Sequence, residues 1–281
     1  MDQDPDWHER EYNPRVRVTD IADITARWVA RAAELRERLP PKTERYGDHS
    51  RETLDFWRAE RPRGAVHVIH GGYWRALSKD EFSWIAAGFL GQGFSVSLLN
   101  YPLCPEVSLT RIRASTEAAF LHLYRNVLDD RERETIVVTG HSAGGYLAAL
   151  HLLTDWTTHG LPAAPIRQVV PISGVFRLAP LVHTSMNEAL RLDAASAQAL
   201  SLDRAQPAFP AEVAFVVGAD ESAEFRSQSE EMARNWASLS PRVVVVERRH
   251  HFDVIDGLGE PGSQLNRLVA EGCTDCHSGA P

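Results

Sequence analysis

The chain has 281 residues, of which 43% are hydrophobic, and its formal net charge is −8. This length and apolar content predict one α/β domain over residues 1–281, because no repeat, low-complexity stretch or Ser/Gly-rich linker divides the chain. The acidic balance, spread without a long acidic run, argues against nucleic acid or an anionic membrane as a partner, so a small-molecule substrate is expected instead.

Residues 1–41 are predicted to form a helical extension at the start of the domain. The first eight residues are acidic and contain no apolar run, so neither a secretory signal nor a membrane span is expected, and the protein is expected in the cytoplasm. Apolar residues recur at helical spacing between Asp20 and Leu39, which predicts an amphipathic helix ended by Pro40-Pro41. Two roles stay open for this helix: covering part of a functional site, or packing on the body of the domain.

Strands and helices are predicted to alternate along the rest of the chain. The predicted strands are 45–57, which is weak, and 65–69, 94–99, 136–138, 168–174, 213–217 and 242–247. The predicted helices are 78–90, with Ser78 and Glu81 at capping-box spacing, and 109–128, 146–153, 222–239 and 263–271. This alternation indicates a doubly wound, mostly parallel sheet, in which functional groups gather outside the carboxyl ends of the strands.

Two segments depart from the alternation. Residues from about 176 to 205 contain helical pieces and no strand, which is typical of a helical cap inserted over a site. Residues 272–281 are predicted to be a loose tail, although Cys273-Thr-Asp-Cys276-His277 matches the haem-attachment pattern C-x-x-C-H. A zinc site would need a second pair of ligands. No metal or cofactor is therefore expected.

The segment Gly140-His-Ser-Ala-Gly144 fits the pattern G-x-S-x-G between a β-branched run and an Ala/Leu-rich helix. This pattern is typical of a sharp strand-to-helix turn, at which a strained serine projects its hydroxyl over the sheet. The helix that follows offers N-terminal amides to a developing negative charge. Ser142 is the predicted nucleophile, and the alternative is a serine in a glycine-rich turn with no chemistry.

The predicted strand 65–69 runs into His70-Gly-Gly-Tyr-Trp74. In α/β-hydrolases such a glycine loop supplies the second half of an oxyanion hole, so donors are expected from Gly71 or Gly72 together with the amide of Ala143. His70 is expected to brace the loop. Tyr73 and Trp74 bring aromatic rings beside the site, for substrate binding or for plain packing.

A serine nucleophile needs a base, and the base needs an orienting acid. In α/β-hydrolases these follow in the chain order Ser, acid, His, each after a strand. After Ser142 the sequence offers Asp220-Glu221 and then His250-His251. Local chemistry does not decide which of the two acids or which of the two histidines takes part.

With these residues in place, the chain resembles the kynurenine formamidase (arylformamidase) branch of the α/β-hydrolases. The likeness spans most of residues 65–258 and rests on the segments 70–74, 140–144, 153–160, 173–176, 184–190, 221–225 and 251–253. Position by position, the resemblance implies Ser142 as nucleophile, His251 as base and Glu221 as acid. The family usually has aspartate at this last position, so Asp220 remains the alternative acid.

The resemblance implies a serine hydrolase that cleaves aryl formamides, namely N-formyl-L-kynurenine to L-kynurenine and formate in tryptophan catabolism. A formyl group is small, so the aryl side needs room and aromatic walls, which Tyr73, Trp74 and Tyr101 are expected to supply. Ser185, Asn187 and Arg177 of the cap are candidates for holding the substrate carboxylate.

Three other readings stay open. The same triad would serve a broad-specificity carboxylesterase or amidase acting on small aryl esters. A non-catalytic binding protein could use this fold, and some formamidases depend on metal, although no His-Glu-x-x-His cluster is present. The sequence also leaves a homodimer open.

Overall fold

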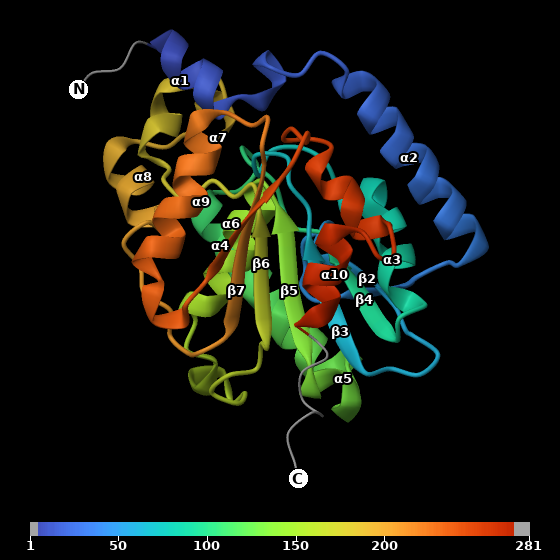
Figure 1. Ribbon diagram of the computed structural model, residues 1–281. Coiled ribbons are helices and arrows are strands. Elements are labelled where there is room, and N and C mark those ends of the chain that lie inside the picture. The colour runs from blue at the N-terminus through green and yellow to red at the C-terminus, as the bar shows by residue number, and fades with distance from the viewer. Residues whose placement is uncertain (1–4, 273–281) are drawn as a thin grey trace.

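The computed structural model describes residues 5–272, and its centre is a mostly parallel sheet (Figure 1). The strand order in this eight-stranded sheet is β1-β2-β4-β3-β5-β6-β7-β8, in which β2 is antiparallel to both of its neighbours, β1 and β4, and all other neighbouring pairs are parallel. The strands are β1 Lys42–Arg45, β2 Thr53–Trp57, β3 Gly64–Ile69, β4 Phe94–Leu99, β5 Ile136–His141, β6 Gln168–Ile172, β7 Glu212–Gly218 and β8 Arg242–Val246. The predicted doubly wound, mostly parallel sheet is confirmed.

Helices cover both faces of the sheet. The α-helices are α1 Pro5–Tyr12, α2 Ile21–Arg38, α3 Ala87–Leu90, α4 Leu109–His122, α5 Asp130–Glu134, α6 Ala143–Leu150, α7 Asn187–Leu190, α8 Ala194–Leu200, α9 Ala223–Asn235 and α10 Gln264–Glu271. Short 3₁₀ segments are η1 Pro14–Val16, η2 Lys79–Ala86, η4 His151–Leu153, η5 Trp156–His159, η6 Ala179–His183, η7 Ala237–Leu239 and η8 Val254–Gly259, and η3 Leu123–Val127 is a π turn. None of the helices within residues 5–272 is long and apolar enough to cross a bilayer.

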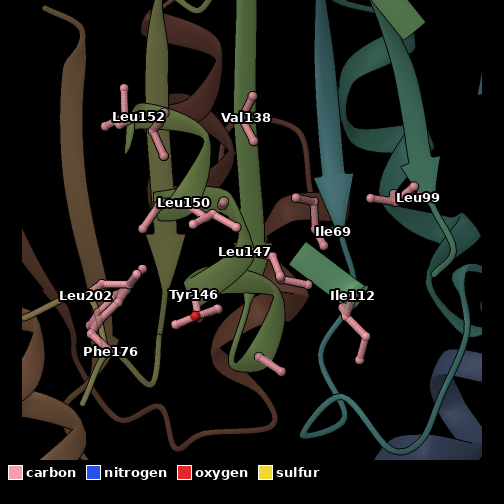
Figure 2. Packing of buried hydrophobic residues seen from close by; sticks show 14 of the residues in the cluster. Ile69, Leu99, Ile112, Val138, Tyr146, Leu147, Leu150, Leu152, Phe176 and Leu202 are labelled. Atoms are coloured by element: carbon pink, nitrogen blue, oxygen red, sulfur yellow. The ribbon is translucent and has the colours of Figure 1, made fainter. Parts of the chain in front are cut away.

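Two hydrophobic clusters hold the layers together, one on each face. The first joins the sheet to α4, α6, α8 and α9, and the second joins it to α2, η2, α3 and α10. Figure 2 shows Tyr146 and Leu147 of α6 among side chains of β3, β5 and α4 in the first cluster. Strand β5 is buried on both faces, which explains why its sequence is a continuous apolar run rather than an alternating one. The strand that carries the serine turn is therefore among the best-fixed parts of the sheet.

The structure corrects several predicted boundaries. The segment 45–57 is not one weak strand, because β1 and β2 lie on either side of a turn. The predicted helix 78–90 begins as the 3₁₀ helix η2, although the capping box of Ser78 and Glu81 is formed. The predicted helix 109–128 ends as an α-helix at His122 and continues as the π turn η3.

The ends of the chain bring a second set of findings. The predicted helix between Asp20 and Leu39 is confirmed as α2, and α1 and η1 precede it within residues 1–41, although no periodic pattern marked their positions. Residues 176–205 hold η6, α7 and α8 and no strand. The Cys273–His277 motif and the predicted tail beyond Gly272 lie outside the described residues.

Candidate active site

Ser142 occupies the turn between β5 and α6 in a strained conformation. Its backbone has φ +56° and ψ −118°, and its N–H donates to the carbonyl of Ile172 at 2.8 Å. A non-glycine residue in such a conformation costs about 1–3 kcal/mol, which the surrounding structure must offset. A Cβ at position 144 would lie 2.0 Å from the carbonyl oxygen of Ile69, so the turn can approach β3 only because residue 144 is glycine. The pattern G-x-S-x-G is thus a packing requirement of this turn.

His251 and Glu221 form a buried pair beside this turn. His251 Nδ1 donates to Glu221 Oε2 at 2.7 Å, and both side chains are almost inaccessible to solvent. The other carboxylate oxygen accepts from Ser173 Oγ at 2.5 Å and from the N–H of Gly218 at 2.8 Å. Three donors therefore fix the carboxylate, and the carboxylate fixes the imidazole tautomer with its proton on Nδ1. Nε2 is left as the basic nitrogen.

The structure separates the two members of each ambiguous pair. Asp220 is exposed, whereas Glu221 is buried against the histidine. His250 turns the other way, since its Nδ1 accepts the N–H of Phe252 at 3.1 Å and lies 3.2 Å from Asp253 Oδ1. Glu221 and His251 are the members that the fold brings together, in agreement with the family resemblance.

The glycine loop after β3 lies directly against Ser142. A Cβ at position 71 would be 3.2 Å from the Cβ of Ser142 and 2.8 Å from the carbonyl oxygen of His141, so only glycine fits. Ala143 is the first residue of α6, and its N–H therefore has no acceptor within the helix. The backbone of Gly71 and Gly72 and the amide of Ala143 flank the serine on both sides.

Two buried histidines shape this region without serving as the base. His70 stacks on Tyr101 with ring centroids 4.3 Å apart and donates from Nδ1 to the carbonyl of Gly71 at 2.7 Å. Burial lowers the pKa of His70 to about 3, so the ring is neutral and braces the loop. His141 donates from Nε2 to the carbonyl of His251 at 2.7 Å, and burial holds the pKa of His141 well below its usual value.

A cavity of about 280 Å³ opens over Ser142 and His251. Its walls are largely aromatic and apolar. The lining residues are Asn13, Pro14, Arg15, Trp28, Gly72, Tyr73, Arg75, Ala76, Leu77, Phe82, His141, Ser142, Met186, His251 and Phe252. The serine and the histidine thus share one small, mostly apolar chamber whose volume is large enough for an aromatic ring.

Of the aromatic residues that the sequence suggested for substrate contact, Tyr73 alone is in this lining set. Trp74 is completely buried and packs edge-on against Tyr146, with ring centroids 5.2 Å apart. Tyr101 is also completely buried, and its hydroxyl donates to the carbonyl of His70 at 2.9 Å. Sequence patterns mark both as aromatics near the site, but packing directs their rings into the core.

The polar candidates from the cap serve the local structure as well. The Asn187 side chain donates to the carbonyls of Val182 and Leu192 and accepts the N–H of Leu192, which closes a turn. Ser185 Oγ donates to Glu9 at 2.7 Å. Arg177 forms ion pairs with two glutamates of α9, Glu224 at 3.0 Å and Glu231 at 3.2 Å. None of these three residues belongs to the described lining of the cavity.

Several of the lining residues that sequence reasoning missed lie in the N-terminal strap, defined here as residues 5–18. Asn13, Pro14 and Arg15 of the strap line the cavity, and α2 adds Trp28. Tyr12 anchors the strap, because its hydroxyl donates to Glu224 Oε2 at 2.8 Å. In Figure 1 the strap (dark blue) crosses the same end of the molecule as the start of α9. The strap is mostly polar and shows no clear hydrophobic periodicity, so the sequence patterns did not mark it as part of a site.

The order of the strands and of the site residues defines the class of protein. A serine turn follows β5, an acid follows β7 and a histidine follows β8 on a mostly parallel sheet, which is the arrangement of an α/β-hydrolase. A family model described as BD-FAE matches residues 57–190. An esterase of Pyrobaculum calidifontis shares the fold with a TM-score of 0.64 at 15% identity, over 95% of both chains.

Two nearer relatives narrow the class. Kynurenine formamidase of Danio rerio is 28% identical over 238 residues, which cover 80% of this chain and 78% of that protein. The crystal structure of a Silicibacter protein to which thioesterase activity is ascribed shows 34% identity, covers 93% of this chain and 98% of its own, and superposes with a TM-score of 0.83. The chain belongs to the kynurenine formamidase-like branch of the α/β-hydrolases and is a hydrolase of the formamide or ester type.

Proposed function

We propose that this enzyme hydrolyses aryl formamides, with N-formyl-L-kynurenine as its substrate in tryptophan catabolism and L-kynurenine and formate as products. The proposed catalytic residues are Ser142, His251 and Glu221. The observation that carries the proposal is the buried contact of 2.7 Å between His251 Nδ1 and Glu221, with His251 and Ser142 lining one cavity. The likeness to kynurenine formamidase of Danio rerio supports the choice of a formamide.

The reaction follows from the roles of these groups. His251 Nε2 takes the proton of Ser142 as the serine oxygen bonds to the formyl carbon. The negative oxygen of the tetrahedral intermediate is bound by amides of Gly71 or Gly72 and of Ala143. Protonated His251 then gives its proton to the arylamine nitrogen as the C–N bond breaks. Water cleaves the formyl ester by the same route, releasing formate and restoring Ser142.

The cavity supports an aromatic leaving group. Trp28, Tyr73, Phe82 and Phe252 line it, and rings of this kind bind another ring by offset or edge-on packing. The acyl side lies where the glycine loop presses against Ser142, which favours the smallest acyl group. A formyl group on an arylamine combines the small acyl group and the aromatic leaving group that these two parts of the cavity favour.

A broad-specificity carboxylesterase acting on small aryl esters is the second candidate. The Pyrobaculum calidifontis esterase and the Silicibacter thioesterase favour it, since both names refer to ester chemistry. The triad does not separate the two reactions, because esters and formamides pass through similar tetrahedral intermediates.

The deciding experiment compares kcat/KM for N-formyl-L-kynurenine with kcat/KM for p-nitrophenyl acetate. We expect the formamide to be the better substrate, although its amide bond is intrinsically the less reactive. An ester preference of several orders of magnitude would overturn the formamidase proposal and favour the carboxylesterase.

A further inference from the structure

The charge of the cavity differs from that of the chain as a whole. The protein carries 38 acidic and 30 basic residues. The described residues that line the cavity nevertheless include two arginines, Arg15 and Arg75, and no aspartate or glutamate. Low-dielectric walls focus the field of charges that line a cleft, so this chamber attracts anions although the protein is acidic.

The two arginines and the reacting groups line the same cavity but differ in their exposure to solvent. Both are exposed, whereas Ser142 and His251 are each only 3% accessible. Arg15 belongs to η1 in the strap, and its Cζ is 6.0 Å from the centroid of the Phe252 ring. Arg75 follows the glycine loop, and its N–H donates to the carbonyl of Gly72 at 3.1 Å. Two solvent-accessible guanidinium groups thus line the cavity that holds the buried reacting groups.

Neither guanidinium has a hydrogen-bonded carboxylate partner in the part of the chain that the structure describes. Within residues 5–272, neither Arg15 nor Arg75 forms an ion pair with a carboxylate. Glu9 lies within electrostatic range of Arg75, but its carboxylate already accepts hydrogen bonds from Asn13, at 2.6 Å, and from the backbone and hydroxyl of Ser185. The donors of both arginines therefore remain available to a ligand.

We propose that Arg15 and Arg75 form an anion subsite that selects aryl substrates carrying a carboxylate on the side chain remote from the reacting bond. The planar guanidinium is suited to bidentate binding of carboxylate. The aromatic walls bind the ring of the substrate, Ser142 and His251 act on its reacting bond, and the two guanidinium groups bind its carboxylate. This inference deepens the proposed function, on which it rests for the nature of the reacting bond, and it moves carboxylate recognition from the cap to the strap and the glycine loop.

A matched pair of substrates tests the subsite. The anionic formamide is 3-(2-formamidobenzoyl)propionate, and its neutral counterpart is the corresponding propionamide, which differs only in the charged group. The measured quantity is the ratio of the two kcat/KM values within each protein variant, so partial loss of folded enzyme cancels. In the wild type we expect the anion to be preferred by at least about tenfold.

Five variants complete the experiment. Arg15→Gln and Arg75→Gln are each expected to lower the ratio by about three- to fivefold, and the double variant by more than tenfold, because exposed ion pairs are individually weak. Arg75→Lys keeps the charge and should restore part of the preference. Arg131→Gln, an exposed arginine of α5 at the opposite end of the strands, is the matched control and should leave the ratio unchanged. A wild-type ratio near one, or a ratio that the double variant does not change, overturns the subsite.

A second pair separates this inference from the proposed function. It consists of 4-acetoxybenzoate and 4-acetoxybenzamide, which carry the same ester and differ in charge. Loss of the anion preference in the double variant on the esters, with no turnover of either formamide, would uphold the subsite and refute the formamidase proposal. Turnover of both formamides with equal kcat/KM would uphold the formamidase proposal and refute the subsite.

Discussion

Single residues fix the chemistry of this site through backbone geometry and one buried carboxylate. Ser142 sits at φ +56°, a conformation that the glycines around it make accessible. Glu221 receives Ser173 Oγ and the N–H of Gly218 on one oxygen and His251 on the other. A carboxylate held by three donors can orient an imidazole without moving during the reaction.

The choice of acid is testable by two neighbouring substitutions. Glu221→Gln keeps the shape but offers the histidine the wrong partner for its tautomer, so kcat should fall by about 10⁴-fold, as for a triad Asp→Asn change. Asp220→Asn is the matched control, since Asp220 is exposed, and should change kcat by less than about twofold. Steady-state kinetics with the anionic formamide, alongside melting temperatures, make the comparison. The reverse ranking would assign the acid to Asp220.

The sequence predicted which types of residue form the site, but it did not predict which member of each adjacent pair takes part. The glycines, Ser142 and the loop at Gly71 follow from motifs whose geometry permits few residues. Local chemistry could not separate Glu221 from Asp220, because the direction of a side chain after β7 depends on packing against Ser173 and His251, which are distant in sequence. Packing against distant residues also buries Trp74 and Tyr101 in the core, which the local sequence could not predict.

Among the structural elements, the N-terminal strap adds one wall to the cavity. Its helix α1 docks through Tyr12 onto Glu224, and the carbonyl of Glu11 accepts Ser222 Oγ at 2.7 Å. The strap then delivers Asn13, Pro14 and Arg15 to the cavity. A segment that no sequence motif marked as part of a site thus lines the cavity.

Removal of the strap should therefore impair substrate binding more than folding. Deletion of residues 1–18 is expected to raise KM for the anionic formamide by about tenfold or more, since it removes one wall and one arginine, while β2 to β8 retain their packing. Tyr12→Phe, which loses the contact with Glu224, should give a smaller increase in KM. Val16→Ala is the control, because Val16 is 54% exposed and outside the cavity lining. Unchanged KM in the truncated enzyme would show that the strap is dispensable.

The elements themselves were predictable where one physical signal dominates. Buried parallel strands such as β5 appear as apolar runs, and α2 shows helical periodicity, so both emerge from the sequence. Helix α1 is only eight residues long and has few apolar residues, so docking on α9 rather than its own pattern stabilises it. The switch from α-helix to π turn after His122 likewise has no local signature.

The molecule as a whole buries several neutral histidines, with a consequence for its acid stability. Burial lowers the pKa of His67 to about 3 and that of His151 to about 4. The unfolded chain therefore binds protons first as pH falls below about 6.5, so folding becomes less favourable on acidification toward pH 4. Each such histidine should cost about 1 kcal/mol of unfolding free energy between pH 7.5 and 5.5.

Urea unfolding at the two pH values measures this loss. His67→Phe is expected to reduce the pH dependence by about the share of one histidine, even if it lowers stability at both pH values. His183→Gln, at an exposed ring of η6, is the control and should leave the pH dependence unchanged. A wild-type stability that does not fall between pH 7.5 and 5.5 would contradict this account of the core.

The account depends most on Ser142 being a nucleophile activated by His251, and covalent labelling tests this directly. A fluorophosphonate probe followed by peptide mass mapping should find one adduct, on Ser142, with none in Ser142→Ala. The labelling rate should fall by about 100-fold or more in His251→Ala and by less than about threefold in His250→Ala. Labelling of another residue, or equal rates in the two histidine variants, would contradict the catalytic assignment.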